Sequence, residues 1–251
     1  MNPTPHARAA LATLPLSFPD PTGVVIVDGG CDWPAEVTRA LRSGAAGVLV
    51  VQPKPADFAE LLELDPSTAV IVDSTWASNP VIGAAAQAFQ AAAADGSRLE
   101  CRVILAPGSD FPTALLDQLI LVRALLSPVS KVRVQYRSDH GFHAEGMTDT
   151  SMTVDLSVVC TTAVPAAATV RLLTSDGSVE LLIPTGDTAE PARLTTAGPD
   201  GAVQAPTQYE TGHRASLRRL RELMASGPAD GLADLRQLHA DVLVTRGAQR
   251  T

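Results

Sequence analysis

Basic residues, aromatic residues and cysteines are all scarce in this chain of 251 residues, and each shortage narrows what the protein can be. Lys and Arg total 19 against 27 Asp and Glu, which gives a formal net charge of −8. A nucleic-acid-binding surface needs clustered cations, so we expect no nucleic-acid partner. Aromatic residues make up only 4% of the chain, so the expected core is filled largely by small aliphatic side chains.

The three cysteines, Cys31, Cys101 and Cys160, lie far apart and show no spacing typical of a metal site. Such an odd, sparse set fits buried thiols in a reducing compartment better than a disulfide framework.

No apolar run is long enough to span a bilayer, and residues 1–17 lack the apolar core of a secretory signal. We therefore expect a cytoplasmic protein that does not bind membranes.

The first half of the chain alternates buried strand patterns with helical patterns. The strand patterns lie at residues 24–27, 47–51, 69–72 and 99–105, and the helical patterns at residues 34–42, 56–64 and 80–94. Continuous apolar, β-branched runs are typical of strands buried on both faces, and their alternation with helices indicates βαβ units on a parallel sheet. We predict an α/β domain over residues 1–106.

From residue 129 onward, apolar and polar residues alternate, which is typical of a sheet with one covered face. Asp176-Gly177 is a strong hairpin turn signal within this region. Two amphipathic helices, predicted at residues 213–226 and 231–246, close the chain. Residues 107–251 are therefore predicted to form an α+β domain, an open and mostly antiparallel sheet with helices on one side. The closing helices are free to pack back on the first domain.

A long helix is predicted within residues 107–128, where turn residues precede Pro112 and an apolar run ends at Ser127-Pro128. Asp110 and Asp117 lie seven residues apart and so share one face of this helix. They are candidate site residues. The structural alternative is that Asp110 stabilises the helix N-terminus and that Asp117 orients a backbone group or an arginine.

Taken together, this layout resembles the glucose–fructose oxidoreductase / inositol dehydrogenase (Gfo/Idh/MocA) family of NAD(P)-dependent sugar oxidoreductases. The resemblance covers roughly residues 23–248. Val51-Gln52-Pro53 is similar to the family's Glu-Lys-Pro, residues 110–117 to its Asp-x-Gly-x-His-x-x-Asp helix, and Ser226-Gly227-Pro228 to the link between its last two helices. The resemblance implies a Rossmann-like domain followed by an open-faced sheet domain.

The departures from the family pattern fall on its chemistry. The chain has no G-x-G-x-x-G motif, which in the family holds the dinucleotide, and the resemblance begins at about the fourth family strand, so the Rossmann-like domain is expected to be shortened. Gln52 stands where the family has its lysine, and Ala114 stands where it has its histidine. Neither side chain can act as an acid or base at neutral pH. The family-equivalent positions that remain as catalytic candidates are Asp117, Asp110 and Gln52.

These departures predict a catalytically degenerate, oxidoreductase-like protein that binds a small molecule or serves in assembly, with no dinucleotide cofactor. One alternative is a working NAD- or NADP-dependent oxidoreductase whose rearranged site uses Lys54, Asp117 or the loop at residues 140–143. Another is a subunit that completes a full-length relative in a hetero-complex. The resemblance also implies self-association through the open sheet face, for which the expected segments are residues 132–136, 152–160 and 168–173.

Ligand-type side chains are densest at His140, His143 and Glu145. Their spacing matches no established metal site, and a polar loop after a strand has the same appearance, so no metal is expected. His213 and His239, on the closing helices, are interpreted as surface or packing residues.

Overall fold

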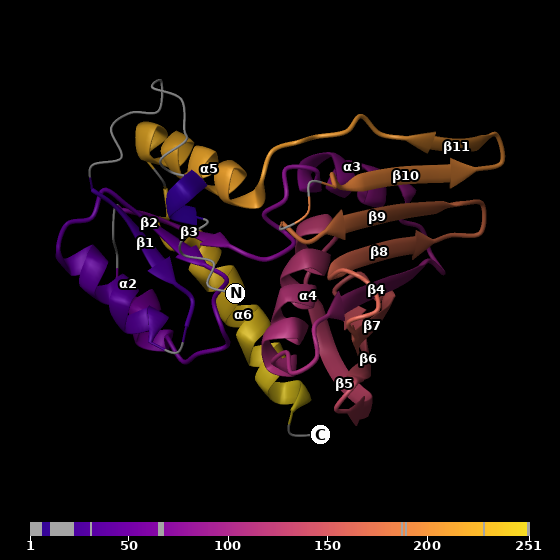
Figure 1. The fold of residues 1–251 in the computed structure, drawn as a ribbon, viewed down its shortest axis with the longest axis horizontal. Coiled ribbons are helices and arrows are strands. Elements are labelled where there is room, and N and C mark those ends of the chain that lie inside the picture. Colours follow the sequence, from indigo (N-terminus) through magenta and orange to yellow (C-terminus); the bar gives the residue numbers. More distant parts are fainter. Residues whose placement is uncertain are drawn as a thin grey trace. The chain divides into compact units, whose positions relative to one another are not determined.

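The structure, a computed structural model, describes residues 7–10, 23–30, 32–64, 68–186, 188, 190–227 and 229–249. The chain divides into two compact units (Figure 1). The first comprises residues 1–78 and 210–242, and the second comprises residues 79–209 and 243–251. The predicted fold class is confirmed, because a small parallel sheet is followed by a larger mixed sheet with helices. Cys31 and Pro228, both used in the sequence analysis, lie outside the described residues.

The first unit is built on a parallel sheet in the order β1-β2-β3. Its strands are β1 (Val24–Asp28), β2 (Gly47–Val51) and β3 (Ala69–Asp73), and its helices are α2 (Trp33–Arg42), α5 (Gly212–Ser226) and the start of α6 (Ala233–Ala248). The central strand β2 is buried along its whole length, as its continuous apolar run predicts. The helix predicted at residues 56–64 is instead a short 3-10 helix, η1 (Ala59–Glu63).

Helix α5 packs on the small sheet through Leu217 and Leu220, which join Leu49 and Ile71 in one buried cluster. Gly47 permits this close approach, since a Cβ atom there would lie 2.8 Å from the Met224 sulfur. A helix near the C-terminus of the chain therefore forms part of the core of the N-terminal sheet.

The outer edge of β3 is covered by the beginning of α6. The Val70 N–H donates to the Gly231 carbonyl at 2.9 Å, and the Val72 N–H donates to Asp234 Oδ2 at 3.1 Å. Asp234 also receives two hydrogen bonds from Arg219 of α5, at 2.8 and 2.6 Å. These bonds satisfy edge-strand amides that would otherwise lack partners, and they tie both closing helices to β3.

The second unit contains an eight-stranded sheet in the order β11-β10-β9-β8-β4-β7-β6-β5. Its strands are β4 (Arg98–Leu105), β5 (Val129–Ser138), β6 (Gly141–Thr148), β7 (Thr153–Cys160), β8 (Ala167–Leu173), β9 (Ser178–Pro184), β10 (Arg193–Gly198) and β11 (Gly201–Gln204). Strands β4 and β7 are parallel, and every other neighbouring pair is antiparallel. The hairpin predicted at Asp176-Gly177 joins β8 to β9.

The strand predicted at residues 99–105 does not join the small parallel sheet. It is β4, which lies between β7 and β8 of the large sheet. Arg98, Glu100 and Arg102 alternate along it with buried residues, so only one of its faces is covered. In the two compact units, α3 and β4 belong to the second unit and not to the one that begins the chain, and α5 belongs to the first, as was left open for the closing helices.

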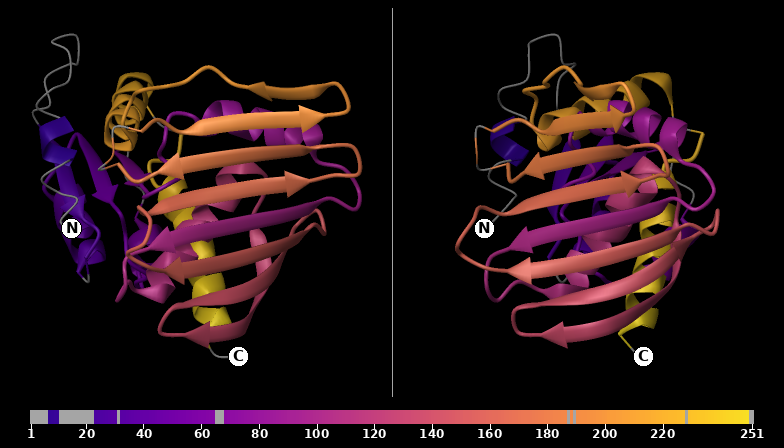
Figure 2. Two further views of the ribbon diagram at one scale, coloured as in Figure 1. Left: turned by 45° about the vertical axis from the view of Figure 1, so that its right-hand side comes forward. Right: turned by 90° about the vertical axis from the view of Figure 1, so that its right-hand side faces the viewer.

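Helices α3 (Ile82–Ala92) and α4 (Phe111–Leu125) cover one face of the large sheet, and the other face is open (Figure 2). The amide of Gln118 on α4 donates to the Cys101 carbonyl of β4 at 2.9 Å and to the Ser157 carbonyl of β7 at 3.0 Å. This fully buried side chain therefore bonds α4 to the two parallel strands.

The open face of the large sheet carries charged side chains. Apolar residues of the predicted association segments, such as Leu156 and Val170, are fully buried on the covered face. On the open face, Arg98 pairs with Asp155 at 2.5 Å, and the Arg171 and Glu180 side chains approach to 3.9 Å.

Within the described part of the chain, no helix has both the length and the apolarity that crossing a membrane requires.

Candidate functional site

The strands of the small sheet end at one edge, where backbone hydrogen bonds hold them together. The Gln52 N–H donates to the Asp73 carbonyl at 2.7 Å, and the Gly29 N–H donates to the Val51 carbonyl at 2.8 Å. Gly29 must be glycine, since a Cβ atom there would lie 2.3 Å from the Gln52 carbonyl oxygen. In open α/β sheets this carboxyl edge is where ligands bind.

Gln52 has a left-handed backbone conformation, with φ of +50°. This conformation costs a residue other than glycine roughly 1–2 kcal/mol, and such strain often occurs at functional sites. The half-buried side chain of Gln52 makes no hydrogen bond to any described residue. At the carboxyl edge, Gln52 therefore presents a side-chain amide that has no hydrogen-bond partner among the described residues.

A buried carboxylate ends β3 and binds two side chains of α5. Asp73 is 1% exposed. Its Oδ1 accepts a hydrogen bond from Ser216 Oγ at 3.0 Å, and its Oδ2 forms a short hydrogen bond with His213 Nδ1. Both carboxylate oxygens are thus satisfied, as a buried charge requires.

The ring of His213 is fixed by Asp73 at one nitrogen and accessible at the other. Its side chain is 21% exposed. Nε2 forms no hydrogen bond to any described residue. It is also not one of the buried polar atoms that lack a partner among these residues, so it is open to solvent. This is the arrangement in which a carboxylate orients an imidazole for acid–base chemistry or for binding.

Asp73 also favours the protonated form of the imidazole. Burial by itself lowers the pKa of His213, but the hydrogen bond and the negative charge of Asp73 outweigh burial, so the pKa lies above its ordinary value of 6.5. In the protonated ring both nitrogens carry a hydrogen, so Nε2 is a hydrogen-bond donor.

Asp73 is not among the site residues predicted from the sequence, and His213 was predicted to be a surface or packing residue. The available signal was Asp73 itself, an acidic residue that directly follows the apolar run of a buried strand. Asp28 ends β1 in the same way, and its Oδ1 accepts a hydrogen bond from the Gly30 N–H at 3.1 Å. Acidic residues at the carboxyl ends of parallel strands are candidates for ligand binding.

Of the predicted site residues, Asp110 is the N-cap of α4. Its Oδ2 accepts hydrogen bonds from the Thr113 N–H at 3.1 Å and from Thr113 Oγ1 at 2.5 Å. Ala114 is buried, and Asp117 is half-buried. At about 100° per residue, these three positions share one side of the helix.

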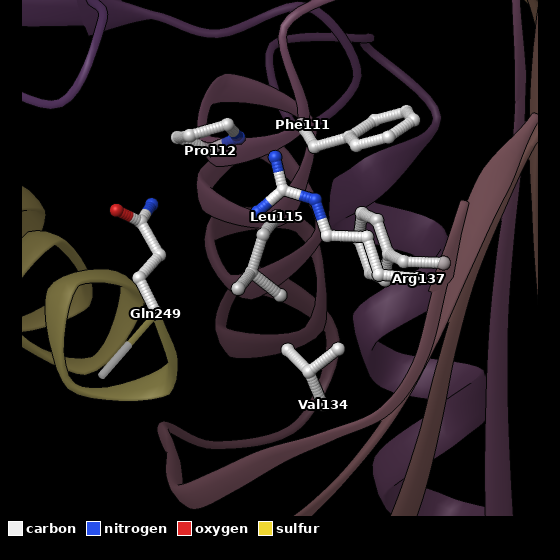
Figure 3. Close-up of a pocket in the computed structure, with 7 residues that line it drawn as sticks. Phe111, Pro112, Leu115, Val134, Arg137 and Gln249 are labelled. Carbon is white, nitrogen blue, oxygen red and sulfur yellow. The ribbon is translucent and has the colours of Figure 1, made fainter. Parts of the chain in front are cut away.

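The opposite side of α4 lines a small hollow in the second unit (Figure 3). Its walls are Phe111, Pro112, Leu115, Val134, Arg137, Phe142 and Gln249. The rings of Phe111 and Phe142 meet edge to face with centroids 5.8 Å apart, and the Arg137 guanidinium lies 5.4 Å from the Phe111 centroid. The lining has no carboxylate, imidazole or thiol, so it offers no acid–base chemistry.

The histidine-containing segment after β5 does not assemble a metal site. His140 is exposed, His143 lies 3.6 Å from Asp155 Oδ1, and Glu145 Oε2 accepts a hydrogen bond from Gln135 at 3.1 Å. No group of three or more metal-ligand side chains occurs among the described residues. Lys54 is exposed, and its backbone bonds to Gly29 and to the Trp33 ring.

No protein-family model matches the sequence, and no curated protein matches it significantly. Solved structures do match the fold, and they are Gfo/Idh/MocA-type oxidoreductases and dehydrogenases. The chain thus shares the fold of these oxidoreductases and dehydrogenases, a Rossmann-like unit and a second sheet domain.

Three structural neighbours illustrate the match. A 3-ketoreductase from Actinomadura kijaniata, solved with NADP, has a TM-score of 0.66 at 14% identity over 96% of this chain and 80% of its own. An aldose-aldose oxidoreductase from Caulobacter crescentus, complexed with glycerol, gives 0.64 at 14% identity over 98% and 80%. An oxidoreductase from Agrobacterium radiobacter, in complex with NAD+, L-tartaric acid and magnesium, gives 0.59 at 14% identity over 87% and 74%.

Proposed function

We propose that this chain is a catalytically degenerate, oxidoreductase-like protein that binds a small molecule and does not transfer hydride by the family mechanism. The observation that carries the proposal is the chemistry of α4. Ala114 holds the position of the family's histidine, and Asp110 is engaged in capping the helix. With Gln52 in the position of the lysine, none of these three groups is an available acid or base.

The chain also lacks the glycine-rich motif that lets a backbone approach a pyrophosphate, which supports the absence of a conventional dinucleotide site. Titration with NAD(H) and NADP(H) tests this part of the proposal, followed by nicotinamide fluorescence for the reduced forms and by protein fluorescence for the oxidised forms. We expect no binding tighter than roughly 100 μM, about −5.5 kcal/mol. Oxidation of sugars or polyols coupled to formation of NADH or NADPH would overturn the proposed loss of hydride transfer.

A matched pair of variants sharpens this test. The double variant Gln52→Lys, Ala114→His restores the family's two ionisable groups, and the single variant Ala114→Val changes only the volume at the helix position. Because only weak dinucleotide binding is expected, activity is measured at millimolar NAD(P)+; if the missing groups are what abolish hydride transfer, activity appears only in the double variant. Equal activity in the wild-type chain and the double variant would contradict the proposal.

The second candidate function is a working NAD(P)-dependent oxidoreductase with a rearranged site. Two observations favour it: neighbours of the same fold were solved with NADP and with NAD+, and Asp73 and His213 form an acid–base pair at the carboxyl edge. The residues that the sequence offers for the acid–base chemistry of such a site are Lys54, Asp117 or the loop at residues 140–143. Loss of a measured turnover in His213→Asn, but not in His140→Asn, would establish this function and its site.

We further propose that the chain associates with itself, or with a full-length relative, through the open face of the large sheet. The paired charges on that face, Arg98 with Asp155 and Arg171 with Glu180, make a polar rather than an apolar association surface. Sedimentation at micromolar concentration is expected to give a dimer or a larger assembly. A monodisperse monomer that captures no relative from its native source would contradict this.

The buried free thiols Cys101 and Cys160 support a cytoplasmic location.

A further inference from the structure

The orientation of the His213 ring is fixed by a buried, hydrogen-bonded carboxylate. Its Nδ1 is bonded to a carboxylate that is itself almost fully buried, and the second oxygen of that carboxylate is held by Ser216. Asp73 therefore cannot rotate away without breaking two hydrogen bonds. The imidazole is fixed in orientation, and the accessible Nε2 is the atom that it offers to solvent.

The charged groups at the start of α5 leave a net positive charge. The charge of Asp73 is balanced by His213, and Glu210 is paired with Arg218 at 2.7 Å. Arg214, the next residue in the first turn of α5, is half-buried and has no carboxylate partner in the described part of the chain. The N-terminus of the 15-residue helix α5 adds a partial positive charge to the same turn.

The position of His213 in the fold places it where a ligand can arrive. Asp73 ends β3, and Gln52, with its uncommitted amide, follows the end of the neighbouring strand β2. The two strand ends are bonded directly through the Gln52 N–H and the Asp73 carbonyl. His213 thus belongs to the carboxyl edge of the parallel sheet, the usual binding edge of such folds.

We propose that His213 is a ligand-binding residue whose Nε2–H donates to an anionic oxygen of a small carboxylate or phosphate compound at the carboxyl edge of the small sheet. This inference rests on the proposed small-molecule function and specifies the chemistry of the ligand. Asp73 and Ser216 are positioning residues, because they act on the ligand only through the imidazole.

Two substitutions separate binding from structural anchoring. In His213→Asn the side-chain amide can replace Nδ1 as the donor to Asp73, while the position of Nε2 is empty. In His213→Gln the amide nitrogen reaches the position of Nε2, and the bond to Asp73 is lost. His140→Asn, at an exposed turn, is the matched control.

The test is a titration of the full chain with inorganic phosphate and, separately, with acetate, followed by 1H–15N correlation spectra of the imidazole rings. We expect saturable shifts of the His213 ring with at least one probe and none of the His140 ring. The probe that acts at lower concentration identifies phosphate or carboxylate as the ligand group. Binding followed through backbone amides should weaken at least tenfold in His213→Asn and stay unchanged in His140→Asn.

The possible failures are distinguishable. If backbone amides report binding of either anion but His213→Asn binds it as well as the wild-type chain, this inference is wrong and the proposed small-molecule function stands. If neither anion shifts the His213 ring, the inference is equally wrong. If the His213 ring responds and the wild-type chain also transfers hydride to NAD(P), the anion site stands and the proposed catalytic degeneracy falls.

Discussion

Asp73, at the end of β3, and His213, in the first turn of α5, are 140 residues apart in the chain and hydrogen-bonded to each other in the fold. Their pairing places a charged carboxylate in a buried position and gives it an imidazole partner whose far side is accessible. The same pairing attaches α5 to the edge of the small sheet where ligands of α/β proteins bind. It therefore has consequences for stability as well as for binding.

Replacing Asp73 with Asn should destabilise the protein by about 3 kcal/mol, because removal of one partner from a buried charge pair leaves the other uncompensated. The measurement is the free energy of unfolding in urea. Asp176→Asn, at an exposed turn, is the control and should change this free energy by less than about 0.5 kcal/mol. Equal effects of the two substitutions would show that the carboxylate of Asp73 has no structural role.

The pairing also predicts how stability depends on pH. The pKa of His213 is higher in the folded protein than in the unfolded chain, so its contribution is fully present below about pH 6.5 and is lost as the pH rises through the folded pKa. Urea unfolding of the wild-type chain and of His213→Asn between pH 5.5 and 8.5 measures this. The stability advantage of the wild type should shrink with rising pH, and an advantage that grows would contradict the assigned partner.

Cys101 should be unreactive in the native protein. Burial raises the pKa of its thiol to about 12, although a hydrogen bond from Gln118 acts in the opposite direction. Because the thiolate is the reactive form, alkylation at pH 8 should leave Cys101 unmodified until urea is added. Peptide mass spectrometry separates it from the other cysteines. Rapid modification without denaturant would mean that the interface of α4 with the sheet opens readily.

Gln118→Leu should cost roughly 2 kcal/mol, because the carbonyl oxygens of Cys101 and Ser157 both lose a buried donor. Gln87→Leu, on the exposed side of α3, provides a control with the same change of side chain. Thermal and urea unfolding of both variants measure the difference. A neutral Gln118→Leu would show that apolar packing alone holds α4 on the large sheet.

Asp110→Ala should destabilise the protein by about 1 kcal/mol through loss of the α4 cap. Asp117→Asn, on the same side of the helix, is likewise expected to affect stability more than any activity. Melting temperatures and turnover assays measured side by side test both expectations. Loss of turnover in Asp117→Asn with an unchanged melting temperature would make Asp117 a catalytic residue and reverse this assignment.

Several elements were predictable because their signals are local. Strands β1, β2 and β3 follow continuous β-branched runs, and α5 and α6 follow amphipathic periods. The cap at Asp110 and the turn at Asp176-Gly177 were also readable, since both depend on residues that are adjacent in sequence. These features need no knowledge of which elements pair.

The misassigned strand β4 shows where local signals end. Its residues predict a strand correctly, but its position after a helix suggested a fourth member of the small parallel sheet. In the fold it pairs in parallel with β7 and antiparallel with β8, both of which come much later in the chain. The alternation of Arg98, Glu100 and Arg102 with buried residues was the sequence signal for a sheet with one open face.

The sequence by itself determined the fold class and the positions of most elements. Only the tertiary structure decided which sheet contains β4 and which carboxylate faces His213. Periodicity reports whether a stretch is buried, because that depends on neighbours within a few residues. It carries no information about which distant stretch supplies the burial, and the pairing of Asp73 with His213 depends entirely on that choice.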